Sequence, residues 1–181
     1  QLVADCAANL GHAYSGFVGI RDLALAAQWY KRSLDLRKED PIGRAKCLVE
    51  LGTVAYRRFL DARKTERPPE EFAGHLSNAE EYYGQALDMY PANAVRELAI
   101  VHNQLGMTYG DGGQIDTALR HFRESIRYKE VMQNRFGAGT SRKNATVTLA
   151  RAGRFADARD WAQSALRDYQ ACENADEDVV G

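Results

Sequence analysis

The 181-residue chain contains little proline and no excess of either charge. Its four prolines, at positions 41, 68, 69 and 91, lie between stretches in which apolar residues recur at helical spacing. Lys and Arg together number 24 against 25 Asp and Glu, so the net charge is -1. A chain with so little net charge has no long-range field that would gather nucleic acid or an anionic membrane surface. We therefore expect neither partner.

Cysteine and long apolar runs are also scarce. Cys6, Cys47 and Cys172 are far apart, and none belongs to a CxxC pair or a Cys/His cluster with metal-ligand spacing. We expect them to be reduced thiols in a cytoplasmic protein. No apolar stretch approaches the roughly 20 residues that cross a bilayer. The chain starts at Gln1 without a signal sequence and stops after an acidic cluster, so we expect it to be part of a larger protein.

The periodicity of apolar residues predicts an all-α protein with eight helices. No stretch alternates with period two between hairpin turns, so no strand is expected. The clearest unit contains a Leu-Gly-x-x-Tyr motif at 105–109, a glycine turn ending at Gly113, and then Ala118, Phe122 and Ser125. Gly106 and Ala118 are small residues at the predicted crossing of two helices, and the larger residues fill the space beside it. Asp111-Gly112-Gly113 is expected to form the turn, with glycine at positive φ.

Similar units occur along the whole chain. The second-helix anchors Tyr30, Tyr83, Phe122 and Ala162 are separated by 53, 39 and 40 positions. The repeat is therefore about 40 residues long, except in the second unit. We expect a single all-α solenoid, a right-handed superhelix of about four helical hairpins. The expected repeats lie at about 2–40, 41–91, 92–135 and 136–173, followed by an acidic tail or truncated helix at 174–181.

The second repeat contains an insertion of about 15 residues near 57–71. The simplest account is a first helix that continues to about Arg63 and a loop broken by Pro68 and Pro69. Such an insertion projects from a solenoid and can contribute specificity. The other interpretation, and the more ordinary one, is a solvated loop.

On these residues the chain resembles the longer tetratricopeptide repeat (TPR) arrays of kinesin light chains, bacterial quorum-peptide receptors and STAND-class signalling ATPases. The links at 36–45 and 128–138 look most like those of the bacterial STAND ATPases. In such arrays the first helices line a concave groove, and an asparagine before the conserved leucine often contacts a bound peptide. The corresponding positions here are Asn9, Glu50, Gln104 and Asn144. The resemblance thus implies a protein- or peptide-binding scaffold.

Other first-helix residues, one turn to either side, are predicted to face the same groove. They are Asp5, Ala8, His12, Lys46, Val49, Thr53, Arg57, Asn103, Met107, Asp111, Lys143, Val147 and Arg151. Their charges are mixed, and Glu50 would disfavour an acidic ligand locally. Chaperone-tail-binding cochaperones need a concentrated set of Lys, Asn and Arg, and only the last repeat shows Lys143, Asn144 and Arg151 together. That function remains a minor alternative.

No catalytic, cofactor or metal motif is recognised in the sequence. The four histidines, at positions 12, 75, 102 and 121, are far apart, and the glycine clusters lack the Lys-Ser/Thr of a phosphate loop. We therefore expect a non-enzymatic module that binds a protein, a peptide or another domain of its own parent protein, as the sensor or docking part of a bacterial signalling protein. The alternative is a structural scaffold that self-associates through its terminal repeat, where Trp161, Leu166 and Tyr169 lack an evident capping helix.

Overall fold

The computed structural model describes the backbone of residues 1–65 and 69–180 and the side chains of residues 1–65 and 72–173. Within these residues the chain is all α-helical, with one short 3-10 helix and no strand. The helices are α1 (Leu2–Gly16), η1 (Val18–Ile20), α2 (Leu23–Leu36), α3 (Pro41–Lys64), α4 (Pro69–Met89), α5 (Val95–Asp111), α6 (Ile115–Val131), α7 (Arg135–Arg151) and α8 (Phe155–Val180). The predicted all-α fold is thus confirmed.

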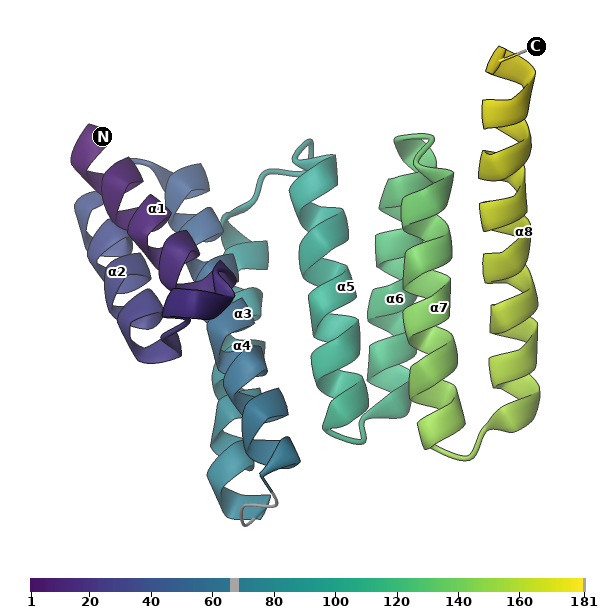
Figure 1. Cartoon of the computed structure of the whole chain (residues 1–181), viewed down its shortest axis with the longest axis horizontal. Coiled ribbons are helices and arrows are strands. Elements are labelled where there is room, and N and C mark those ends of the chain that lie inside the picture. Colours follow the sequence, from purple (N-terminus) through teal and green to yellow (C-terminus); the bar gives the residue numbers. More distant parts are fainter. Residues whose placement is uncertain (66–68, 181) are drawn as a thin grey trace. The chain divides into compact units, whose positions relative to one another are not determined.

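The helices form two compact units, Gln1–Pro91 and Ala92–Gly181. In unit 1, α1 packs against α2 and α3 against α4, and the two hairpins meet where α2 contacts α3. In unit 2, α5 packs against α6 and α7 against α8, and α7 contacts both α5 and α6 (Figure 1). Each unit is therefore a pair of helical hairpins.

A glycine facing an aromatic ring brings the two helices of a hairpin together. A Cβ atom on Gly11 would lie 2.6 Å from the ring of Tyr30, and one on Gly52 would lie 2.6 Å from Tyr83. In unit 2 the same distance separates a Cβ on Gly106 from Phe122. No real Cβ atom fits so close to a ring, so these positions require glycine. The glycine of each Leu-Gly pair is therefore needed because it is small, as the sequence predicted.

The second helices carry the core of each unit. Ala26, Tyr30, Ala79 and Tyr83 have no exposed surface in unit 1, and Ala118 and Phe122 have none in unit 2. Buried hydroxyls add a polar link between paired helices. Ser33 Oγ donates to the Ala4 carbonyl at 2.8 Å, and Ser125 Oγ donates to the Ala99 carbonyl at 2.7 Å.

Local sequence explains several helix ends. Asp22 caps α2, and its carboxylate accepts hydrogen bonds from the amides of Ala24 and Leu25. Asp40 caps α3 with Pro41 as the first helical residue, and Asn134 caps α7. Gly113 and Gly153 have φ angles of 79° and 75° in the turns after α5 and α7. The predicted glycine at positive φ in the first of these turns is confirmed.

The predicted insertion near 57–71 coincides with the long α3, which ends at Lys64, and with the start of α4 at Pro69. Residues 66–68, including Pro68, lie outside the described part of the chain. The tail at 174–180 continues α8, and its acidic side chains also lie outside the description. Among the described helices, none is long and apolar enough to pass through a membrane.

Candidate functional site

A cavity of about 570 Å³ opens in unit 1 between the first helices of its two hairpins, α1 and α3. Five of the side chains that the sequence placed in the groove line it together. They are Asp5, Ala8, His12, Lys46 and Glu50. The remaining lining residues are Gln1, Tyr30, Arg37, Asp40, Ile42, Gly43 and Cys47. Charges of both signs and an imidazole therefore face one space that could hold a peptide segment.

Tyr30 anchors the imidazole at one side of this cavity. Its hydroxyl oxygen lies 2.9 Å from His12 Nδ1 and 3.2 Å from Ser15 Oγ. Burial raises the pKa of Tyr30 to about 12, so the phenol keeps its proton and can donate to the imidazole. Glu50 Oε2 lies 3.9 Å from the same Nδ1 atom. The His12 ring is thus held in place by the Tyr30 hydroxyl and faces Glu50 on the next hairpin.

Arg37 forms the charged end of the cavity, and its side chain is only 11% exposed. Its guanidinium pairs with Asp5 of α1 and, at 2.8 Å, with Asp40 at the start of α3. The hydrogen bond from the Gly43 amide, and next the one from Arg37, lowers the pKa of the Asp40 carboxyl below its usual range. Unit 1 therefore neutralises its own buried cation with two carboxylates.

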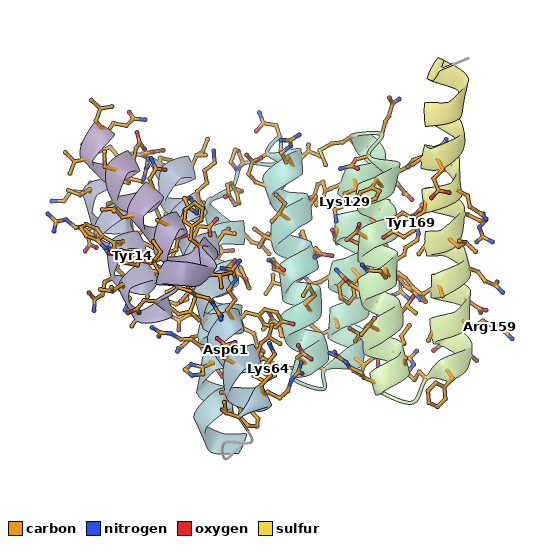
Figure 2. The ribbon with its side chains drawn as sticks, viewed as in Figure 1. Tyr14, Asp61, Lys64, Lys129, Arg159 and Tyr169 are labelled. Atoms are coloured by element: carbon orange, nitrogen blue, oxygen red, sulfur yellow. The ribbon has the colours of Figure 1, made fainter. Side chains whose placement is uncertain are left out.

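The other predicted residues of unit 1 lie outside this cavity. Thr53 Oγ1 is 3.2 Å from the hydroxyl oxygen of the buried Tyr83, and burial raises the pKa of that phenol. Arg57 Nη1 donates to the Ser15 carbonyl at 2.6 Å and lines a separate cavity of about 350 Å³ with Asp61 and Lys64. Asn9 is exposed on α1. Figure 2 shows Tyr14, Asp61 and Lys64 on the helices of unit 1.

In unit 2 the predicted amide side chains meet each other. Asn144 Nδ2 on α7 donates to Asn103 Oδ1 on α5 at 3.2 Å, and both amide groups approach Met107 Sδ at 3.6 to 3.7 Å. Gln104 is half-buried and Lys143 is exposed. Arg151 pairs with Asp111 at 3.0 Å, so one of the three residues behind the cochaperone alternative already has an acidic partner.

The same amides connect to a cation that the sequence analysis missed. Ser141 Oγ donates to Asn103 Oδ1 at 2.9 Å, and Lys129 Nζ donates to Ser141 Oγ at 2.7 Å. Lys129 is half-buried, and burial lowers its pKa to about 8. Its place could have been found from the sequence, because Lys129 follows Phe122 by seven residues as Arg37 follows Tyr30.

Two histidines that are far apart in sequence also meet in unit 2. His102 Nδ1 on α5 lies 3.0 Å from His121 Nδ1 on α6, and the rings of Tyr128 and Tyr109 stack on the pair. The pKa of His121 is lowered to about 4, mainly by burial and next by the neighbouring His102. Burial also lowers the pKa of His102. The described side chains contain no group of three His, Cys, Asp or Glu residues placed to hold a metal ion.

Comparisons with known proteins identify the fold of the chain but no family. No family model matches the chain, and no curated protein matches it. Among solved structures, the one titled "Crystal structure of MamA", a TPR-containing protein, is similar over 94% of this chain and 81% of that chain. The TM-score is 0.66 and the sequence identity is 16%. The chain therefore has a TPR-like fold of helical hairpins, as predicted, whereas the resemblance to a particular TPR subtype stays a prediction.

Proposed function

We propose that this chain is a protein- or peptide-binding module whose ligand lies against the first helices of each unit. The observation that carries the proposal is the 570 Å³ cavity between α1 and α3. It is lined by side chains of both charges and by the imidazole of His12. In unit 2 the amides of Asn103 and Asn144 occupy the corresponding helices, α5 and α7. An amide offers both a donor and an acceptor to the backbone of a peptide.

Two further features support a binding module. His12 and Lys46 are exposed at the cavity in unit 1, and Lys143 is exposed on α7 in unit 2, so an imidazole and two ammonium groups are available to a partner. Within each unit, the TPR-like fold also brings the first helices of its two hairpins close enough for one ligand to contact both. As in the sequence analysis, we propose a sensor or docking region of a larger bacterial signalling protein, with a partner that is either a separate protein or another domain of the same parent.

The test is peptide selection from a random display library, followed by affinity measurements on groove variants. One variant replaces His12, Lys46 and Glu50 with Ala, and a second replaces Asn103, Gln104, Lys143 and Asn144 with Ala. We expect each to weaken selected peptides at least tenfold with an unchanged helical circular dichroism spectrum. The matched control replaces Arg159 and Asp160, two exposed residues of α8, and should leave affinity unchanged. Unchanged affinity in both groove variants contradicts the proposal.

Self-association is a second candidate, favoured by the exposed face of α1. Cys6 and Leu10 occupy the positions that Cys47 and Leu51 occupy in α3. Leu51 is 2% exposed because α2 packs against it, whereas Leu10 is 39% exposed. At the other end, Leu166 of α8 is 55% exposed, but Tyr169 packs against Phe136. Light scattering over a concentration series tests this candidate, and a constant monomer mass would contradict it.

A further inference from the structure

Each unit has an arginine that reaches from its second hairpin to the end of the first helix. Six residues after the leucine of each Leu-Gly pair, α1 has Gly16, α3 has Arg57 and α5 has Asp111, and the aligned residue of α7 is Arg151. In unit 2, Arg151 Nη1 pairs with the Asp111 carboxylate at 3.0 Å. In unit 1, Arg57 Nη1 donates to the Ser15 carbonyl at 2.6 Å. The two arginines are therefore equivalent in position, but only the second has a carboxylate partner.

The place of this carboxylate is open in unit 1. The residue of α1 that corresponds to Asp111 is Gly16, which has no side chain. Nothing from the surrounding structure lies within 4 Å of the point where a Cβ atom on Gly16 would be. An acidic group supplied by a ligand could therefore reach Arg57 at the point where unit 2 uses its own Asp111.

This open space is part of the cavity of about 350 Å³ that Arg57 lines. Helix α3 continues to Lys64, seven residues past Arg57, whereas α7 ends at the equivalent Arg151. These seven residues form about two extra turns, so the predicted insertion makes one wall of the cavity. The side chains that this wall contributes are Leu60, Asp61 and Lys64 (Figure 2 labels the last two). The opposite wall comes from the end of α1 and the link that contains η1.

The charges that line this cavity are not balanced. Arg21, Arg57 and Lys64 are cationic, and Asp61 is acidic. Asp61 pairs with Arg21 at 2.7 Å, and among the described side chains no carboxylate pairs with Arg57 or Lys64. Arg57 is half-buried, so the lack of a counter-charge costs more than it would on an open surface. Two cations therefore line a space whose size falls within the range of ligand pockets, roughly 300–1,000 Å³.

The end of α1 does not prevent an anion from binding here. The last carbonyls of a helix carry partial negative charge and would ordinarily repel an anion. In unit 1 the Tyr14 carbonyl accepts a hydrogen bond from the Asp22 amide at 2.8 Å, and the Ser15 carbonyl accepts the one from Arg57. Arg57 uses Nη1 for this bond, so its other N–H groups can donate to an oxyanion.

We propose that this cavity binds the phosphate group of a phosphorylated serine or threonine in the bound peptide, with Arg57 and Lys64 as the cations that hold it. The inference rests on the proposed function and names a chemical feature of the ligand in unit 1. A phosphate monoester carries about −1.5 to −2 charges at pH 7 and matches two cations, whereas a carboxylate would neutralise only one. Its three oxygens can also accept from a guanidinium and an ammonium at once. Phosphorylation of the partner would then control its binding.

The test is a nuclear magnetic resonance titration of the full chain, read at the Gly16 amide and the Arg57 Nε–H group. The main probe is an acetylated and amidated pentapeptide with phosphoserine between alanines. The comparison probes are the same peptide with serine, the same peptide with glutamate, and inorganic phosphate. We expect a saturable shift with the phosphopeptide, affinities about tenfold lower for the glutamate peptide and inorganic phosphate, and no response to the serine peptide. Equal affinity for the glutamate peptide or inorganic phosphate overturns the assignment.

Variants at Gly16 provide a matched pair that differs in one charge. Gly16→Asp transfers the carboxylate of unit 2 to the open place beside Arg57 and should weaken phosphopeptide binding about tenfold or more. Gly16→Asn has nearly the same shape without the charge and should change the affinity less than about threefold. Arg57→Gln with Lys64→Gln should abolish the response, with an unchanged helical circular dichroism spectrum. Phosphopeptide binding that persists in Gly16→Asp and in the double variant overturns the inference.

The outcomes distinguish this inference from the proposed function. If the phosphopeptide gives no response while the groove variants lose affinity for library-selected peptides, the proposed function stands and the phosphate site falls. If the phosphopeptide binds through Arg57 while both groove variants keep full affinity for the selected peptides, the groove assignment falls and the phosphate site stands.

Discussion

Unit 1 and unit 2 share a backbone plan but differ in how they treat the polar groups buried behind their first helices. In unit 1, Arg37 is enclosed by Asp5 and Asp40, and the cavity in front of it is lined by charges of both signs. In unit 2, Lys129 donates to a serine and is connected to two asparagines through that serine. Each unit thus has one buried serine at this point, Ser33 or Ser125, whereas the ion pairs beside it are present only in unit 1.

The aromatic anchors show a related difference. Tyr30 and Tyr83 of unit 1 have hydroxyls that reach Ser15 and Thr53, but Phe122 of unit 2 has none. All three rings meet the glycine of the opposite helix at the same distance. Packing against glycine is therefore common to both units, and the phenol hydroxyl is an addition specific to unit 1.

The largest expected effect comes from breaking the packing that the units share. Gly106→Ala would place a methyl group 2.6 Å from the Phe122 ring, and we expect a loss of about 2–3 kcal/mol in the free energy of unfolding. Denaturant unfolding followed by circular dichroism measures it. The control is Gly84→Ala, where nothing lies within 4 Å of the new methyl group, and it should stabilise α4 by about 0.5–1 kcal/mol. Equal effects of the two substitutions would contradict this account.

The next effect is a difference in stability between variants of the two cations, Arg37 and Lys129. Arg37→Met leaves Asp5 and Asp40 without their partner, and we expect a loss of about 2 kcal/mol. Lys129→Met removes a half-buried charge that has no carboxylate partner, so stability should be unchanged or rise by up to about 1 kcal/mol. Denaturant unfolding of both variants provides the comparison. A loss of similar size at Lys129 would show that unit 2 also neutralises its cation internally.

A smaller effect is expected from the phenol hydroxyls of unit 1. Tyr30→Phe removes the contacts to Ser15 and His12, and Tyr83→Phe removes the contact to Thr53. Each should cost about 1 kcal/mol in thermal or denaturant unfolding. Tyr82→Phe is the control, because its ring packs at the edge of the same core. If Tyr82→Phe costs as much as Tyr30→Phe, the hydroxyl bonds are not the cause.

The smallest effect near neutral pH is expected from the histidine pair of unit 2. The unfolded chain binds protons at its histidines below the ordinary pKa of 6.5, whereas folded His121 does so only near pH 4. The free energy of unfolding should therefore fall as the pH is lowered from about 6.5 to 4. Hydrogen exchange of the α5 and α6 amides measures the loss. His121→Phe should flatten this dependence, and a slope that persists would assign it to other groups.

The repeat pattern was sufficient to predict the helices and the anchors of both units. Tyr30, Tyr83 and Phe122 recur with a small residue at the crossing, and size complementarity of this kind is visible in the sequence. It was also sufficient to place Asp5, His12, Lys46 and Glu50 on one surface, because all lie on first helices. Their role in binding remains a prediction.

Contacts between helices were harder to predict. The four histidines are far apart in the sequence, and this separation did not reveal that His102 and His121 meet across α5 and α6. It also assigned Asn103 and Asn144 to the groove without recognising that they bond to each other and, through Ser141, connect to Lys129. Side-chain partners on different helices depend on rotation and register, which the spacing along one helix does not specify.

The sequence by itself determined the hairpin architecture, since helical periodicity, glycine at the crossings and the positions of caps are local or strictly repeated features. Only the tertiary structure decided which groups satisfy the polar side chains within each unit. The physical reason is that a buried charge is stabilised by whichever groups lie within a few ångströms. For Arg37 these are Asp5, 32 positions earlier, and Asp40, whereas Lys129 donates to the hydroxyl of Ser141.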